Sequence, residues 1–234
     1  MKIALLGYGK MGRTIEEIAT KRGHTIVLIV DKENTNYDIT QADVAIDFSI
    51  PDAAVSNISN CLNNGVPIIS GTTGWLDQYN DMVTLATQKN GAFIYASNFS
   101  LGVNIFFELN KKLAQMMSNL KQYDVTLEEI HHTQKLDAPS GTAITLAESI
   151  IKHSRYEKWK LDNQENETDI PITSKRIENV PGTHHVSYTS EVDTIGISHT
   201  AHNRQGFALG AVIAAEWLIG KKGVFEMKDV LNIG

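Results

Sequence analysis

The sequence predicts an α/β protein made of a parallel-sheet domain and a smaller α+β domain with a mixed sheet. Two observations predict this class. In the first hundred residues, short apolar runs alternate with runs of helical period, which is the pattern of βαβ units. After residue 101, a long apolar helical run is followed by segments in which apolar and polar residues alternate, as they do in half-buried strands.

The elements of the first domain follow from these runs in chain order. Strands are predicted at residues 2–6, 25–30, 43–48, 66–70 and 92–96, and helices at about 10–22, 51–63 and 76–89. The polar stretch 31–41 has eleven residues, which is too short for a crossover that contains a full helix, so an abbreviated connection is expected there. Ligands of such sheets bind at the carboxyl ends of the strands. We therefore expect the segments that follow the strands to converge on one crevice.

The second domain is predicted to begin with a long apolar helix from Leu101. An alternating strand at 123–130 then leads to His131. Residues 154–175 are rich in Glu, Asn and Lys and show little periodicity, so they are predicted to form an exposed excursion. Alternating segments within 176–199 are predicted to be strands of a small mixed sheet. Four further histidines are predicted to lie on the sheet surface or a pocket rim, without a role of their own: His184, His185, His199 and His202.

Composition and charge narrow the classes of function. The formal charge is −6 and no run of Lys or Arg exceeds two residues, which argues against nucleic acid as a partner. No apolar run approaches the length that spans a bilayer, and Met1-Lys2 is followed directly by the first strand, so neither a membrane span nor a signal peptide is expected. The single cysteine, Cys61, is predicted to be a small buried residue on a helix, and its isolation fits a reducing cytoplasm.

A glycine-rich turn follows the first predicted strand. Gly7-Tyr8-Gly9-Lys10-Met11-Gly12 has the spacing G-x-G-x-x-G between a strand and a helix, which is the context of dinucleotide binding in Rossmann-like domains. Gly7 allows the tight turn, Gly9 lets the main chain approach a pyrophosphate, and Gly12 lets the helix lie close to the strand. Glycines that served only the turn would not explain Asp31, which follows at the expected distance.

The residues after two other strands bear on the cofactor. Asp31 can accept hydrogen bonds from an adenosine ribose, which favours NADH, whereas Lys32 can pair with a 2′-phosphate, which favours NADPH. The sequence therefore predicts NADH or NADPH as cofactor without choosing between them. From composition alone, Gly71-Thr72-Thr73-Gly74 is best explained as a plain strand-to-helix turn with a threonine cap.

The segment from Glu129 to Ala143 reads E-I-H-H-T-Q-K-L-D-A-P-S-G-T-A and concentrates groups that carry chemistry. His131, His132 and Lys135 can move protons or hold an anionic substrate. Ser140-Gly141-Thr142 opens an apolar helical run, and the free N–H groups at its start suit a phosphate or a carboxylate. The segment is therefore a candidate acid/base and anion-binding site.

The same segment has other interpretations. Solvated loop residues would explain it without chemistry. A structural zinc site is weak because no Cys shares the segment and Lys135 would have to be neutral to bind the metal, so no metal is predicted. A serine hydrolase is weaker still because no G-x-S-x-G is present, and Ser140 is better explained as a helix N-cap. Asp137 is interpreted as a turn residue or an orienting partner.

The chain resembles the 4-hydroxy-tetrahydrodipicolinate reductase (dihydrodipicolinate reductase) family, whose motif reads E-x-H-x-x-x-K-x-D-x-P-S-G-T-A. This motif is complete from Glu129 to Ala143, and the resemblance includes Gly71–Gly74, Ser97–Ser100 and Arg204 followed by a Gly/Ala-rich helix. It spans nearly the whole chain. The abbreviated stretch at 31–41 departs from the longer second unit that is common in the family.

The resemblance implies a role for each of these segments. His131 and Lys135 are implied as the proton-transfer pair and His132 as a substrate contact. Ser140, Gly141 and Thr142 are implied as the cradle of one substrate carboxylate, and Arg204 as a contact of the second. The residues implied at the nicotinamide end of the cofactor are Gly71, Thr72, Thr73, Ala96, Ser97, Asn98 and Phe99.

The resemblance also implies domain bounds and an assembly. Residues 1–100 and 205–234 would form the dinucleotide-binding domain, with the last helix at 207–218 packed on it, and residues 101–204 would form the substrate-binding and tetramerisation domain. The implied reaction is NAD(P)H-dependent reduction of a cyclic dicarboxylate by a cytoplasmic homotetramer in diaminopimelate and lysine biosynthesis. Two alternatives are another amino-acid dehydrogenase on the same scaffold and a non-catalytic dinucleotide-sensing protein.

Overall fold

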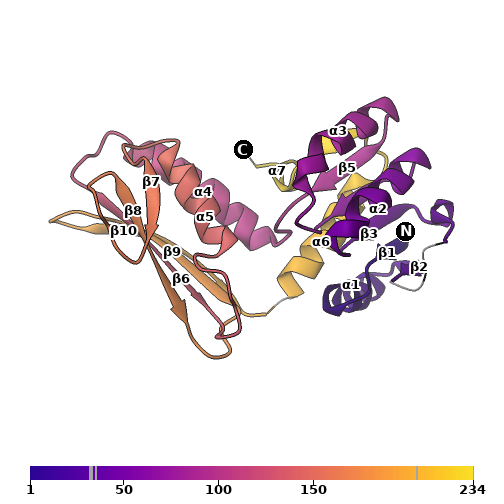
Figure 1. The fold of residues 1–234 in the computed structure, drawn as a ribbon, viewed down its shortest axis with the longest axis horizontal. Coiled ribbons are helices and arrows are strands. Elements are labelled where there is room, and N and C mark those ends of the chain that lie inside the picture. The colour runs from indigo at the N-terminus through magenta and orange to yellow at the C-terminus, as the bar shows by residue number, and fades with distance from the viewer. Residues whose placement is uncertain (32–33, 35, 204, 234) are drawn as a thin grey trace. The chain divides into compact units, whose positions relative to one another are not determined.

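The computed structural model describes residues 1–31, 34, 36–203 and 205–233 (Figure 1). Its contacts divide the chain into two compact units, Met1–Asn104 with Gln205–Gly234, and Ile105–Arg204. The chain passes from the first unit into the second within helix α4, Leu101–Met117. Each unit has its own sheet and its own hydrophobic core.

The first unit is built on a six-stranded sheet in the order β11-β5-β4-β3-β1-β2, in which all pairs are parallel. The strands are β1 Lys2–Leu6, β2 Thr25–Val30, β3 Val44–Asp47, β4 Ile68–Ser70, β5 Ala92–Tyr95 and β11 Gly223–Phe225. The predicted Rossmann-like parallel sheet is confirmed. Only β11 has no counterpart among the predicted strands.

Helices cover both faces of this sheet (Figure 1). Helices α1 (Lys10–Lys21) and α6 (Gln205–Leu218) share one buried cluster with Ile3 and Leu5 of β1. Helices α2 (Pro51–Asn63) and α3 (Tyr79–Gln88) share the other with Ala4 and Leu6. Alternate residues of β1 thus point to opposite faces that are both buried, which explains the continuous apolar run in the sequence. A short helix α7, Met227–Leu231, closes the chain.

Among its described residues, the connection between β2 and β3 contains a 3-10 helix, Ile39–Gln41, as its one helical element, and β3 still lies beside β1 in parallel. The abbreviated connection is confirmed, and the strand order is kept without a helix there. Cys61 is fully buried on α2, as predicted, and burial raises the pKa of its thiol.

The second unit is built on a five-stranded mixed sheet in the order β10-β9-β6-β8-β7. Strand β8 is parallel to β6 and β7, whereas β9 is antiparallel to β6 and β10. Helices α4 and α5 (Gly141–Ile151) pack on one face, with Phe106 and Leu146 against Val125 and Leu127. The strands are β6 Asp124–His131, β7 Lys158–Leu161, β8 Asp169–Arg176, β9 Gly182–Thr189 and β10 Thr194–Ala201.

The prediction of an exposed excursion at 154–175 was wrong for the strands in it, although residues 161–167 are exposed. This stretch contains β7 and most of β8, and Ile170 and Ile172 of β8 are fully buried. Pro171 between them obscured the alternation, because proline is a poor residue for an internal strand. Arg176 ends β8 rather than opening a strand, and Ile177 beyond it is exposed.

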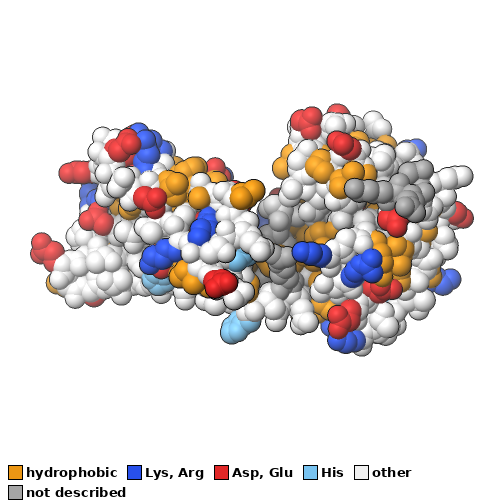
Figure 2. Space-filling model, turned by 60° about the horizontal axis from the view of Figure 1, so that its bottom comes forward, with side chains coloured by type: hydrophobic (Ala, Val, Ile, Leu, Met, Phe, Trp, Pro, Cys, Tyr) orange, Lys and Arg blue, Asp and Glu red, His pale blue; other side chains and the backbone are white. Residues whose placement is uncertain are grey.

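A membrane and a nucleic acid would place different requirements on the described helices and side chains. None of the described helices is long and apolar enough to cross a bilayer. On the face shown in Figure 2, basic and acidic side chains are interspersed rather than gathered by sign.

Candidate functional site

The glycine-rich turn between β1 and α1 is held by close contacts of two glycines. Gly7 has φ +98°, and a Cβ there would lie 2.2 Å from the carbonyl oxygen of Phe48. A Cβ on Gly12 would lie 2.4 Å from the carbonyl oxygen of Gly7. A Cβ on Gly9, in contrast, would meet nothing within 4 Å. The turn thus needs glycine at positions 7 and 12 for packing, while Gly9 leaves open space in front of the main chain.

That open space belongs to a cavity of about 670 Å³ at the carboxyl ends of β1, β2 and β3. Its size is typical of a small-molecule site. Helix α1 begins beside it at Lys10, and no side chain of the described residues caps its first turn, so N–H groups are available to an anion. The lining residues are Gly7, Tyr8, Gly9, Val30, Asp31, Phe48, Ser49, Ile50, Ala53, Ser56 and Asn57.

These features fit the pyrophosphate and adenosine of a dinucleotide. Asp31 lies on the cavity wall, where a ribose could reach its carboxylate. The hydroxyl of Tyr8 donates to Glu16, and the guanidinium of Arg13 lies over the Tyr8 ring at 4.6 Å from its centroid. Arg13 was not singled out from the sequence. Lys32, the residue expected to favour NADPH, lies outside the described residues.

A buried carboxylate, Asp47, organises the two loops beside this cavity. Ser49 Oγ and Ser70 Oγ each donate to it at 2.7 Å, and Asn57 Nδ2 donates at 3.0 Å. Thr72 Oγ1 accepts from the main-chain N–H of Ser49 at 2.8 Å. Burial raises the pKa of Asp47, and the donors partly offset this rise. Sequence reasoning missed Asp47, although an acid that ends an apolar strand was a usable signal.

The segments expected at the nicotinamide end follow β4 and β5. Gly71 donates its N–H to the carbonyl oxygen of Asp47 at 2.9 Å, and the carbonyl oxygen of Thr72 accepts from Trp75 Nε1 at 2.7 Å. The Phe99 side chain is buried in the core under α6, so a ligand there would meet its main chain rather than its ring. Ala96, Ser97 and Asn98 lie between the end of β5 and this buried ring, and Thr73 lies in the turn after β4.

In the second unit, strand β6 places Glu129 and His131 on the same face. Because side chains alternate along a strand, both continue the buried row of Val125 and Leu127. The Glu129 carboxylate is fully buried, and its Oε2 is hydrogen-bonded to Nδ1 of His131. A buried carboxylate therefore orients the first of the two residues expected to transfer protons.

Arg176, at the end of β8, connects this pair to the loop that carries Lys135. Its Nη2 donates to Oε1 of Glu129 at 2.9 Å and to the carbonyl oxygen of Asp137 at 2.6 Å. Its Nε donates to the carbonyl oxygen of Lys135 at 3.3 Å. Burial would raise the pKa of Glu129, but the hydrogen bonds from His131 and Arg176 outweigh it and hold that pKa at about 2. Glu129 is thus a carboxylate at neutral pH.

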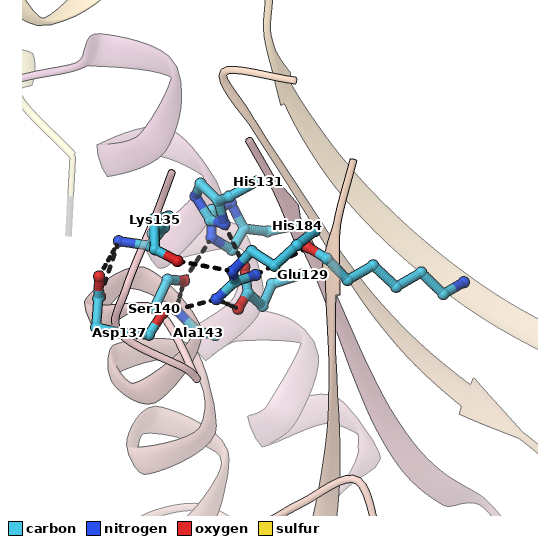
Figure 3. A network of polar contacts seen from close by, with 9 residues as sticks. Glu129, His131, Lys135, Asp137, Ser140, Ala143 and His184 are labelled. Carbon is cyan, nitrogen blue, oxygen red and sulfur yellow. Dashed lines mark hydrogen bonds and ion pairs between the residues drawn. The ribbon is translucent and has the colours of Figure 1, made fainter. Parts of the chain in front are cut away.

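Lys135 has a partner of its own. Its Nζ lies 2.8 Å from both carboxylate oxygens of Asp137, and Lys135 lowers the pKa of that carboxyl. Figure 3 shows the Lys135 side chain directed toward Asp137. This geometry favours the interpretation of Asp137 as an orienting partner. The structure records no direct hydrogen bond between the described side chains of Lys135 and His131.

The predicted N-cap of the following helix is confirmed. Ser140 Oγ accepts from the main-chain N–H of Ala143 at 3.3 Å, and α5 begins at Gly141. A Cβ on Gly141 would meet nothing within 4 Å, so this helix start is open to a ligand. Ser140 is itself buried, and its Oγ also lies 3.0 Å from Nε2 of His184.

The prediction that His184 lies on the sheet surface or a pocket rim was wrong. His184 is 5% exposed, and its ring lies 5.1 Å from that of His131 in an edge-to-face arrangement. Burial, with a further contribution from His131, lowers the pKa of His184 to about 3. Its place in the alternating row with Val186 and Tyr188 was the signal for a buried position.

The other three histidines of this group differ from His184. His185 points to the opposite face and is bonded to Ser187 at 2.7 Å. His199 stacks near Phe106, and partial burial lowers its pKa. His202 lines a cavity of about 410 Å³ together with the predicted substrate residue His132. Arg204, the other predicted carboxylate contact, lies outside the described residues.

The buried cluster has the chemistry of a proton network rather than a cation site. Ligand-type atoms of Glu129, His131 and His184 lie within 4.8 Å of one another. Each oxygen of Glu129 already accepts a hydrogen bond, one from Arg176 and one from His131. The guanidinium of Arg176 would repel a metal ion at that position.

Comparison with known proteins agrees with this geometry. Residues 1–99 match the family described as "Dihydrodipicolinate reductase, N-terminus", and residues 102–231 match "Dihydrodipicolinate reductase, C-terminus". A curated protein of Christiangramia forsetii named 4-hydroxy-tetrahydrodipicolinate reductase is 58% identical over 99% of this chain and 98% of the relative. A protein of the same name from Methanoregula boonei is 37% identical over 82% of this chain and 75% of the relative.

Solved structures show the same fold. A dihydrodipicolinate reductase from Paenisporosarcina sp. TG-14 with bound dipicolinate superposes with a TM-score of 0.77 at 24% identity, over 97% of both chains. Aspartate semialdehyde dehydrogenase II from Vibrio cholerae superposes with a TM-score of 0.54 at 11% identity, over 92% of this chain and 97% of that one. With both family halves matched and a relative of 58% identity, the chain belongs to the dihydrodipicolinate reductase family.

Proposed function

We propose that the chain catalyses the NAD(P)H-dependent reduction of 4-hydroxy-tetrahydrodipicolinate to tetrahydrodipicolinate, in diaminopimelate and lysine biosynthesis, with His131 and Lys135 as the proton-transfer pair. The observation that carries this proposal is the complete segment from Glu129 to Ala143, in a chain 58% identical to a reductase of that name. NADH or NADPH is the cofactor of this reductase family. The network around His131 and Lys135 supplies acid/base groups for such a reaction.

The first unit is proposed to bind the cofactor. The helix start at Lys10 would face the pyrophosphate, and Asp31 the adenosine ribose. The glycine turn contributes Gly7, Gly9 and Gly12, with Tyr8 and Met11 between them. The proposed nicotinamide contacts are Gly71, Thr72, Thr73, Ala96, Ser97, Asn98 and Phe99. When bound, the nicotinamide supplies the hydride.

The second unit is proposed to bind the substrate and deliver the proton. The open helix start at Gly141-Thr142, capped by Ser140, suits one carboxylate of a cyclic dicarboxylate. His132, which lines the cavity of about 410 Å³, is proposed as a second contact, and Arg204 is proposed from the sequence as a third. Loss of the 4-hydroxyl as water gives a conjugated imine, and hydride addition to it leaves negative charge that a proton must neutralise. The Lys135 ammonium is the proposed donor, and His131 its partner.

Turnover of authentic substrate tests this proposal. The purified chain is expected to oxidise both NADH and NADPH in the presence of 4-hydroxy-tetrahydrodipicolinate, and to leave them unchanged without it. Calorimetric titration with each reduced nucleotide should show binding. Nucleotide binding without turnover would support a dinucleotide-sensing protein instead, and absence of binding of both nucleotides would contradict the role of the first unit.

The second sheet supports a proposal about assembly. Its helices α4 and α5 lie on one face, and small polar side chains such as Ser187, Ser198 and Thr200 lie on the other. Strand β10 forms one edge of the sheet, where main-chain groups are open to pairing. An uncovered face and edge of this kind suit contact with a second copy, and we propose a homotetramer formed through this sheet. A cytoplasmic location is proposed from the lone, buried Cys61.

Sedimentation velocity tests the assembly. At micromolar concentration the chain is expected to sediment at about four times its mass of 25.9 kDa. Ser198→Arg, which places a large charged group on the uncovered face, should shift the distribution toward smaller species. A wild-type chain that sediments only as a monomer would contradict the proposal.

A further inference from the structure

The two proposed proton-transfer residues are joined through a third and a fourth side chain. His131 is held by Glu129, and Lys135 lies on the loop after β6. Arg176 reaches both: one nitrogen bonds Oε1 of Glu129 at 2.9 Å and the carbonyl of Asp137 at 2.6 Å, and another bonds the carbonyl of Lys135 at 3.3 Å. A single guanidinium therefore contacts the carboxylate behind His131 and the main chain that carries Lys135.

The two oxygens of Glu129 have different hydrogen-bond partners, and this determines which ring nitrogen of His131 carries the proton. An ionised carboxylate accepts hydrogen bonds and donates none. Oε1 of Glu129 is occupied by Arg176, so Oε2 requires a proton on Nδ1 of His131. Nε2 is then the ring nitrogen that gains or loses a proton. It lies at the start of β9, where a Cβ on Gly182 would come within 3.0 Å of it.

We propose that Glu129 and Arg176 are positioning residues of the reductase, in which Glu129 holds the proton of His131 on Nδ1 and Arg176 ties that carboxylate to the Lys135 loop. This inference rests on the proposed function, because it assigns its partners to the His131 and Lys135 pair. It adds two residues that neither substrate nor cofactor needs to touch. Arg176 suits this role because its planar fork donates several hydrogen bonds in fixed directions at once.

Among the described residues, the titratable and charged groups around His131 lie on three strands and one loop. Glu129 lies on the same strand, Arg176 on β8, His184 on β9, and Lys135 with Asp137 on the following loop. His184 is uncharged at neutral pH, because burial lowers its pKa to about 3. In the described part of the chain, the charges nearest the imidazole are therefore the Glu129 carboxylate, the Arg176 guanidinium and the Lys135–Asp137 pair.

Glu129→Gln tests the first half of the proposal. The amide keeps the size of the carboxylate, but its oxygen is expected to turn to the Arg176 guanidinium and its NH₂ group to Nδ1 of His131. This forces the proton of the neutral imidazole onto Nε2. Nitrogen-15 NMR of histidine-labelled protein with a neutral His131 ring should show an Nδ1–H tautomer in the wild type and an Nε2–H tautomer in the variant. His131→Ala identifies the signal.

Turnover should follow the tautomer. Glu129→Gln is expected to lower kcat by about 10- to 100-fold and to leave the KM for nucleotide unchanged. In serine proteases, a change that puts the catalytic histidine in the wrong tautomer costs more than this. Glu128→Gln is the matched control, because Glu128 is paired with Lys175 on the opposite face of the same two strands. It removes the same charge and should retain wild-type kcat, with sedimentation checking that assembly is intact.

Arg176→Lys and Arg176→Ala test the second half. Lysine restores a positive charge beside Glu129 but cannot bond the carboxylate and both loop carbonyls together. Arg176→Lys is therefore expected to keep the Nδ1–H tautomer and still lose kcat at least about 10-fold, as does Arg176→Ala. Full activity of Arg176→Lys would show that charge alone suffices and would overturn the tie to the Lys135 loop.

The outcomes separate this inference from the proposed function. An Nε2–H tautomer in the wild type would overturn the role of Glu129 whether or not any variant folds. Unchanged kcat in a folded Glu129→Gln chain would do the same. If the wild type turned over its substrate but His131→Ala were equally active, the assignment of His131 in the proposed function would fail, while the spectra would still decide what Glu129 does to the ring.

Discussion

Lys135→Ala is expected to lower the turnover number by a factor of about 10² or more while leaving the affinity for reduced nucleotide unchanged. The ammonium of Lys135 would supply the proton and stabilise the charge that develops before its transfer. The side chain is held by both oxygens of Asp137 at 2.8 Å, so its position is defined without substrate. Steady-state kinetics at saturating substrate and calorimetric titration with nucleotide measure the two effects separately.

Lys160→Ala provides the control for this prediction. Lys160 also pairs with a carboxylate of the second unit, Glu165 at 2.8 Å, but lies on β7 at the far end of the sheet order from β10. Its loss should leave turnover near the wild-type value. His131→Ala should resemble Lys135→Ala, with a smaller loss where water can replace the imidazole. A Lys135→Ala enzyme with near wild-type turnover would reduce the lysine to a binding group and place the donor elsewhere.

The first unit could be predicted from the sequence because its signals are local. Each apolar run is a strand or a helix face, and the spacing of Gly7, Gly9 and Gly12 already contains the turn. Strand β11, Gly223–Phe225, was missed because it begins with a glycine and lies between Lys222 and Glu226, so no apolar run of strand length marks it. Its pairing with β5 depends on a long-range contact that no local pattern encodes.

The buried face of the second sheet was harder to predict from the sequence, because its strands place polar site residues as well as apolar core residues in buried positions. Polar residues occupy buried positions of β6 and β9, where Glu129, His131 and His184 interrupt an otherwise apolar row. Such positions contradict the hydrophobic alternation that identifies a buried face. These buried polar residues form the candidate site. They are stable in buried positions because a hydrogen-bond network satisfies them.

The sequence could predict which segment of the chain carries the candidate site, but not which distant residues contact it. His131, Lys135 and Ser140 lie within ten residues of one another, so their motif was visible. Their partners are distant in sequence: Arg176 contacts Glu129 across 47 residues, and His184 contacts Ser140 across 44. These pairings arise from the register of β6 with β8 and β9, which a single sequence does not specify.

The stability of the chain is expected to fall steeply with acid, because two buried groups of this network have pKa values far below their ordinary ones. His184 has a pKa of about 3 instead of 6.5, and Glu129 about 2 instead of 4.5. In each case the unfolded chain binds the proton first, so the free energy of unfolding is highest above the ordinary pKa and decreases as pH falls toward the folded value. His184 acts between pH 6.5 and 3, and Glu129 between pH 4.5 and 2.

Between pH 6 and 5, His184 should contribute a slope of about 1.4 kcal/mol per pH unit, in addition to the contribution of His199, whose pKa is also lowered by burial. Urea unfolding at a fixed protein concentration measures it, and His184→Gln, which cannot take up a proton, should remove that slope. His202→Gln, at an exposed histidine, should leave the slope in place. Parallel pH profiles for the wild type and His184→Gln would mean that His184 is not held uncharged by burial, and that the ring beside His131 can carry a charge of its own.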